Sequence, residues 1–70
     1  MIQEQLFKLA VKAAKGKKLD VSSRSIDGFY TITFARGGKV LAEETQRIVN
    51  EEGIDLSVVE ERLIMKVSHL

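Results

Sequence analysis

Cysteine and proline are both absent from these 70 residues. Without cysteine, no disulfide and no thiolate metal site can form. The one histidine, His69, cannot hold a zinc ion alone, because zinc sites take several protein ligands. Without proline, peptide isomerisation adds no slow folding phase. We therefore expect neither a metal nor a cofactor.

Long apolar runs are also lacking. No stretch of about eighteen apolar residues occurs, and Met1 leads directly into an amphipathic segment rather than a signal peptide. Hydrophobic residues make up 44% of the chain and charged residues 30%, which is typical of a globular protein. Because the lack of cysteine fits a reducing compartment, we expect a cytoplasmic protein that does not bind membranes.

The length predicts one small domain over residues 1–70, of a size at which a single core is only marginally adequate. Ordering such a chain costs on the order of 100 kcal/mol of conformational entropy. Since disulfides and thiolate metal sites are excluded, self-association is the ordinary remaining way to bury more surface. We therefore expect a homodimer.

The net charge of +1 conceals an uneven distribution. Residues 1–40 carry eight Lys or Arg against three acidic residues, which gives +5, and residues 41–70 carry three against seven, which gives −4. A chain polarised in this way can bind an acidic partner at one end or pack head to tail with itself. The alternative is an ordinary solvated surface.

The pair Asp27-Gly28 lies between two runs of β-forming residues and predicts a type I′ hairpin turn, in which both central residues need a positive φ. We therefore predict an antiparallel hairpin over residues 19–35, with Ile26 opposite Phe29. This register gathers five apolar residues on one face: Leu19, Val21, Tyr30, Ile32 and Phe34. The other face carries Asp20, Ser22, Arg24, Thr31 and Thr33.

Helical spacing is clearest in residues 2–15, which we predict to be a helix ending at Gly16. Its apolar face carries Ile2, Leu6, Leu9, Ala10 and Ala13, flanked by Phe7, Val11 and Ala14. We interpret Arg36-Gly37-Gly38 as a flexible junction and predict a second helix over residues 39–52, closed by Gly53. The apolar face of that helix consists of Val40, Leu41, Ile48 and Val49.

Residues 54–70 are ambiguous. Leu63, Met65 and Val67 alternate with Arg62, Ile64, Lys66 and Ser68, which favours a strand with the first three in the core. A further short strand is possible over residues 54–59. Against this, Ser57 and Glu60 match a capping box that would begin a helix. With the strand, the order αββαβ predicts an α+β two-layer sandwich whose two helices cover one face of the sheet.

The uncovered face of that sheet is the first candidate site. Ile26 and Phe29 lie near the turn, and a final strand would bring Ile64 beside them. Three cations would share the face: Arg24, Arg62 and Lys66. Such a surface suits a dimer interface, nucleic-acid binding through stacking and phosphate contacts, or solvent.

A lysine stripe on the first helix is the second candidate, and it comprises Lys8, Lys12, Lys15, Lys17 and Lys18. It could follow a phosphate backbone, and we expect such binding to be independent of sequence, because the stripe contains no Arg, Asn or Gln to read base edges. The other interpretation is a solvated helix face.

No catalytic constellation is present. His69 lies next to the C-terminus, and no serine has a GxSxG context. Neighbouring acidic residues do not converge on one point, so we expect the following pairs to be solvated surface charge: Glu43-Glu44, Glu51-Glu52 and Glu60-Glu61. We therefore expect no enzyme and no small-molecule substrate. Our hypothesis is a homodimeric interaction module, and the alternative is accessory nucleic-acid binding by the cations named above. The expected interface is either the sheet face, with Ile26, Phe29 and Ile64, or the flank of the first helix, with Phe7, Val11 and Ala14.

Overall fold

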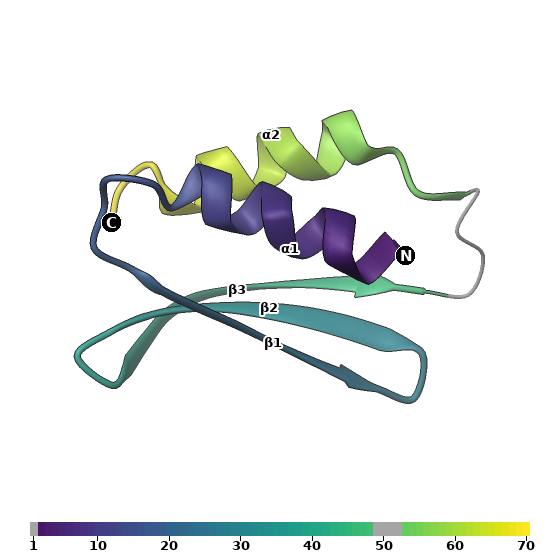
Figure 1. Cartoon of the computed structure of the whole chain (residues 1–70), viewed down its shortest axis with the longest axis horizontal. Coiled ribbons are helices and arrows are strands. Elements are labelled where there is room, and N and C mark those ends of the chain that lie inside the picture. The colour runs from purple at the N-terminus through teal and green to yellow at the C-terminus, as the bar shows by residue number, and fades with distance from the viewer. Residues whose placement is uncertain (1, 49–52) are drawn as a thin grey trace.

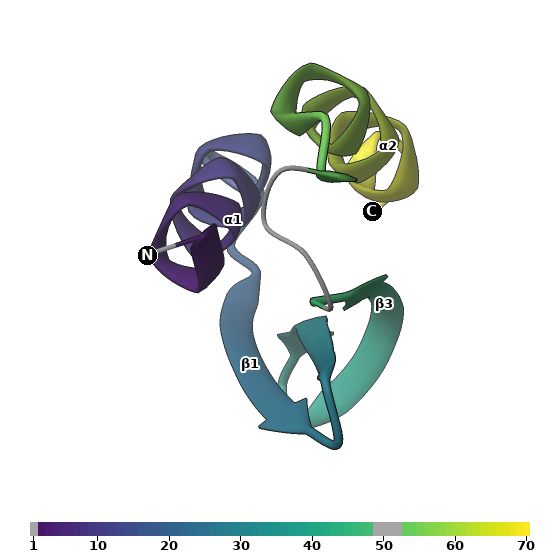
Figure 2. The ribbon, with the colours of Figure 1, turned by 90° about the vertical axis from the view of Figure 1, so that its right-hand side faces the viewer.

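The computed structural model describes residues 2–48 and 53–70. Its elements are α1 (Ile2–Ala13), β1 (Asp20–Ile26), β2 (Phe29–Arg36), β3 (Lys39–Arg47) and α2 (Leu56–Val67). The strands form one antiparallel sheet in the order β1-β2-β3. Both helices cover the same face and run parallel to each other (Figure 1). Figure 2 shows α1 above the β1 side of the sheet and α2 above the β3 side. The predicted α+β two-layer sandwich is confirmed.

The predicted hairpin register is confirmed along its length, from Ile26 opposite Phe29 to Asp20 opposite Ala35. Asp27 and Gly28 both have a positive φ, of 51° and 80°, as a type I′ turn requires. The apolar side chains of β2 that we expected beneath the helices are buried, and these are Tyr30, Ile32 and Phe34.

The helix predicted over residues 39–52 is wrong where the structure describes it, and residues 49–52 lie outside the described part. Residues Lys39–Arg47 form β3, which pairs with β2. Gly37 and Gly38, with φ of 59° and 81°, make a tight turn that sets Lys39 opposite Arg36. A Gly-Gly pair between two strands is itself a hairpin signal. The junction therefore turns the chain back along the sheet instead of beginning a helix.

The strand predicted within residues 54–70 is also wrong, as is the short strand over residues 54–59, because α2 occupies most of this segment. The apolar residues that decide the matter are Val59, Leu63 and Val67, which are spaced four apart and are all buried. Met65, which the strand would have placed inside, is 71% exposed. The predicted order αββαβ is thus corrected to αβββα.

The core lies between the sheet and the two helices. Its buried apolar residues are Ile2, Leu6 and Ala10 of α1, Ala14 in the turn after α1, Tyr30, Ile32 and Phe34 of β2, and Val59, Leu63 and Val67 of α2. The two helices pack side by side, and Lys12 of α1 forms an exposed ion pair with Glu60 of α2 at 3.5 Å. Within the described residues, neither helix is long and apolar enough to span a membrane.

The N-terminus of α2 is capped by Asp55, not by Ser57 as the capping box had indicated. The Ser57 hydroxyl donates to Asp55 Oδ1 at 2.7 Å, and the backbone N–H groups of Ser57 and Val58 donate at 3.0 and 3.4 Å. The hydroxyl, followed by the two N–H groups, lowers the pKa of Asp55 below its ordinary value of 3.8, because each bond favours the charged carboxylate.

We predict that Asp55→Ala lowers the thermal midpoint at neutral pH, because α2 loses its cap. Since the pKa of Asp55 is depressed in the folded chain, its contribution is full well above pH 3.8 and declines as the pH falls through the folded-state pKa. Thermal melts of wild type and variant should therefore converge in acid. A difference that stays constant from neutral pH to pH 2 or so would contradict this.

Candidate functional site

One buried carboxylate joins β3 to α2. Glu44 is 2% exposed and faces the helices, although its position in β3 would usually carry an apolar residue. Lys66 Nζ lies 3.0 Å from Glu44 Oε1, and Arg62 Nε lies 3.3 Å from Oε2. Gln46 Nε2 also donates to Oε2, at 2.8 Å. Two cations and an amide thus compensate the charge that the fold buries.

This arrangement corrects two expectations. Glu44 does not belong to a solvated acidic pair. Arg62 and Lys66 do not share the open sheet face with Arg24, because they project from α2 on the opposite side of the sheet. Ile64 is likewise on α2, where its side chain is 49% exposed. The predicted group of three cations and an isoleucine on one surface does not exist.

The open sheet face is the side of the sheet that no helix covers. At its turn end Ile26 and Phe29 lie directly opposite each other and are 58% and 46% exposed. Val40, 53% exposed, lies at the other end, opposite Ala35. Directly opposed residues share a face of a sheet, so apolar side chains occupy both ends of this surface.

Polar residues occupy the centre of the open sheet face. Glu43 Oε2 lies 3.4 Å from Arg24 Nη2 and accepts from the Thr33 hydroxyl at 3.4 Å. The hydroxyls of Thr31 and Thr45 lie 3.0 Å apart and share a hydrogen bond. Thr31 and Thr33, expected to be exposed, are each only 8% exposed, because β2 is the central strand and its neighbours flank it on both sides.

A second surface runs between α1 and β1. Two hollows, of about 440 and 620 Å³, lie along this α1/β1 groove. The first is lined by Gln3, Glu4, Phe7, Lys8, Ser23 and Tyr30. The second is lined by Val11, Lys12, Ala14, Lys15, Gly16, Lys18, Leu19 and Val21. The groove therefore combines an apolar wall with lysines.

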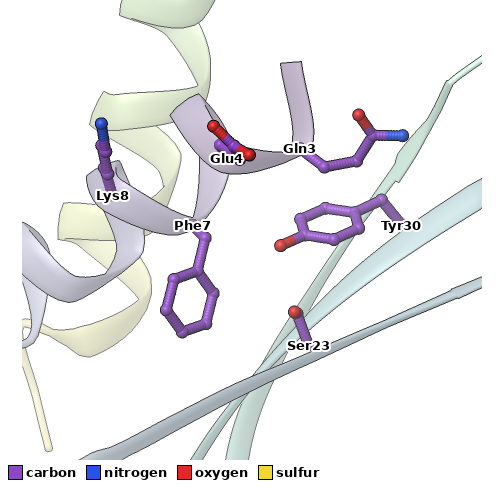
Figure 3. Close-up of a pocket in the computed structure, with 6 residues that line it drawn as sticks. All are labelled: Gln3, Glu4, Phe7, Lys8, Ser23 and Tyr30. Carbon is purple, nitrogen blue, oxygen red and sulfur yellow. The ribbon is translucent and has the colours of Figure 1, made fainter. Parts of the chain in front are cut away.

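The first hollow exists because β1 carries small side chains beneath α1. In Figure 3 the rings of Phe7 and Tyr30 border a gap above Ser23, and the Gln3 side chain lies over the tyrosine. Ser23 pairs with Ile32 and so faces the helices, but a serine is too short to fill the space below α1. Gln3 Oε1 is buried and has no hydrogen-bond partner within the described residues.

The predicted interface residues therefore separate into three places. Ile26 and Phe29 are together on the open sheet face, Phe7 and Val11 line the α1/β1 groove, and Ile64 lies apart on α2. Sequence reasoning missed Ser23 and Glu44. The register already placed Ser23 on the helix-covered face, where a small polar residue indicates an unfilled space. For Glu44, the sequence around it in β3 gives no signal that this side chain is buried and that of its neighbour Glu43 is exposed.

The lysine stripe is mostly on the rim of the α1/β1 groove. Lys8 borders the first hollow, and Lys12, Lys15 and Lys18 border the second. Lys17 stands apart from them, and its backbone carbonyl accepts a hydrogen bond from Arg36 Nη2 at 2.7 Å. The stripe thus forms a basic border to an apolar groove.

Among residues 2–48 and 53–70, no group of three or more His, Cys, Asp or Glu side chains is placed to hold a metal ion. Glu44 lines neither of the two hollows of the α1/β1 groove. Comparison with protein families, with curated proteins and with solved structures gives no match to this chain.

We predict that Arg62→Met and Lys66→Met each cost about 1 kcal/mol of unfolding free energy or less, because the other cation remains beside Glu44. The double variant should cost about 3 kcal/mol or more, since it leaves a buried carboxylate without a cation. Urea unfolding followed by circular dichroism measures all three values. As a control, Lys8→Met with Lys15→Met removes the same charge from exposed side chains. Strictly additive losses in the α2 variants would contradict the shared role.

Proposed function

We propose that this chain is a small non-enzymatic interaction module that self-associates through the open sheet face. The observation that carries the proposal is a sheet with both helices on one side and three large apolar side chains on the other: Ile26, Phe29 and Val40. A sheet buries its second face against a further layer in many folds, and a second copy can supply that layer.

The charges of this face suit contact between two identical surfaces. In a two-fold dimer the same patch meets itself, so it has to be self-complementary. Arg24 and Glu43 supply one charge of each sign in the centre, and the surrounding threonines are neutral. A patch with a single sign would repel its copy, whereas this one does not.

The expected affinity follows from the size of the face. Three strands about 4.8 Å apart, with seven to nine residues each at about 3.3 Å, present a surface roughly 14 Å by 25 Å. The area of a rectangle of this size is below the 800 Å² or so of surface that each partner buries in a standard protein–protein interface. The dimer should therefore be weak, with a dissociation constant in the micromolar range or above.

We predict that sedimentation equilibrium gives an average mass rising with concentration from 7.8 kDa toward twice that value. Ile26→Glu and Phe29→Glu should hold the chain at the monomer mass, because each places a carboxylate among the apolar contacts. Both side chains are about half exposed, so the fold should tolerate the changes.

Ile64→Glu is the matched control, since Ile64 is exposed to a similar extent but lies on α2. It should dimerise as the wild type does. A wild-type mass of 7.8 kDa up to about 1 mM would contradict self-association altogether. A dimer that is lost in Ile64→Glu and kept in Phe29→Glu would place the interface on α2 instead.

The nucleic-acid alternative has less support. Of its cations, Arg24 lies beside Glu43, and Arg62 and Lys66 lie beside Glu44 on another side of the molecule. In the lysine stripe, Lys12 pairs with Glu60, whereas Lys8, Lys15, Lys17 and Lys18 form no ion pair with another described residue. Titration with a labelled DNA duplex tests whether these lysines bind nucleic acid.

A further inference from the structure

We infer that the α1/β1 groove binds an extended, acidic segment of another protein, which adds a fourth strand to the sheet along β1. Strand addition of this kind takes affinity from backbone hydrogen bonds and specificity from alternate side chains that enter pockets. The surface is separate from the open sheet face, so the inference holds for monomer and dimer alike.

Among residues 2–48 and 53–70, no strand pairs with the outer edge of β1, which is the side facing away from β2. A β-turn joins its first and fourth residues by a backbone hydrogen bond, so the N–H and C=O of Ile26 point toward β2. These directions alternate along an antiparallel strand. The groups of Val21, Ser23 and Ser25 therefore point away from the sheet, where a further strand could pair with them.

The two edges of the sheet differ. At the β3 edge, Lys66 Nζ donates to the backbone carbonyl of Glu43, and the β2–β3 pairing contains a register shift between Phe34 and Ala35. Bulges and lysines are devices that keep an edge strand from pairing with other chains. Along β1 the register is continuous over seven residues, without proline, and the side chains below α1 include two serines. This edge has no bulge and no lysine, and its two charged side chains, Asp20 and Arg24, lie on the open sheet face and not in the α1/β1 groove.

The groove has room for the side chains of an added strand. Figure 2 shows α1 toward the outer side of β1, so a strand placed beside β1 would lie beneath the helix flank. Its helix-facing side chains would reach the two hollows, whose apolar walls include Phe7, Tyr30, Val11 and Val21. Gln3 Oε1, which is buried and has no partner among the described residues, would accept a hydrogen bond from such a segment.

The charge of the rim identifies the partner as acidic. Lys8, Lys12, Lys15 and Lys18 border the hollows, and among the described residues Glu4 alone adds a carboxylate to their lining. The same charges disfavour a second copy at this edge, because two-fold pairing of β1 with itself would bring two lysine rims together. An acidic segment is attracted instead, and its association should slow as salt is added.

The probe is a labelled short peptide of alternating valine and threonine residues with glutamates at both ends, followed by fluorescence anisotropy. We expect it to bind, and the same peptide with terminal lysines to bind at least about tenfold more weakly. Amide hydrogen exchange should then slow at Val21, Ser23 and Ser25 and change little at Ser22 and Arg24, whose N–H groups already point to β2.

Ser23→Lys and Ser22→Lys form a matched pair. Both serines are exposed neighbours in β1 and both variants add one positive charge, but only Ser23 faces the groove. Ser23→Lys should weaken peptide binding about tenfold or more, and Ser22→Lys should leave it within about twofold. If Ser23→Lys does not fold, the exchange pattern of the wild type decides alone.

Three results would overturn the inference. Equal or tighter binding by Ser23→Lys would mean that the lysines attract the peptide without strand addition. Binding of a labelled DNA duplex in place of the peptide would assign the lysines to nucleic acid. A wild-type dimer abolished by Ser23→Lys and not by Phe29→Glu would identify the occupant of the edge as a second copy, and would also move the proposed dimer interface.

Discussion

The carboxylate of Glu44 ties the two layers together, and the placement of α2 depends on it. It lies on the helix-facing side of β3, where burying an unpaired charge would be costly. Arg62 and Lys66, one helical turn apart on α2, both reach it, and Gln46 donates from the same strand. This pairing turns the basic flank of α2 toward β3 and directs the apolar flank of the helix into the core.

The position of α2 decides which surfaces stay free. With α2 held over β3 and α1 packed beside it, no described helix or strand lies below the sheet, and none pairs with the outer edge of β1. The first consequence is the open sheet face with its apolar ends. The second is the α1/β1 groove, where small serines under a helix leave two hollows. Both proposed interactions thus follow from how two helices share three strands.

Local signals were sufficient for the first half of the chain and insufficient for the second. The Asp27-Gly28 turn and its flanking alternation predicted every pair of the first hairpin, because turn chemistry and register are set by adjacent residues. The helical spacing of the apolar residues of α1 was an equally clear signal. In β3 the helix-facing positions are Ala42, Glu44 and Gln46, so the alternation typical of a half-buried strand is missing. The Gly37-Gly38 pair indicated a hairpin turn, but the same pair is also compatible with a junction between a strand and a helix.

By itself, the sequence determined the class of fold, the hairpin register, the helix-covered face of β1 and β2, and the exposure of Ile26 and Phe29. It did so because these depend on residues a few positions apart, through turn geometry and side-chain period. Only the tertiary structure decided that residues 39–47 are a strand and that residues 56–67 are a helix over it. The reason is that Glu44 is tolerable in β3 only when cations eighteen and twenty-two residues later lie within 3.3 Å of it, and no local pattern records that contact.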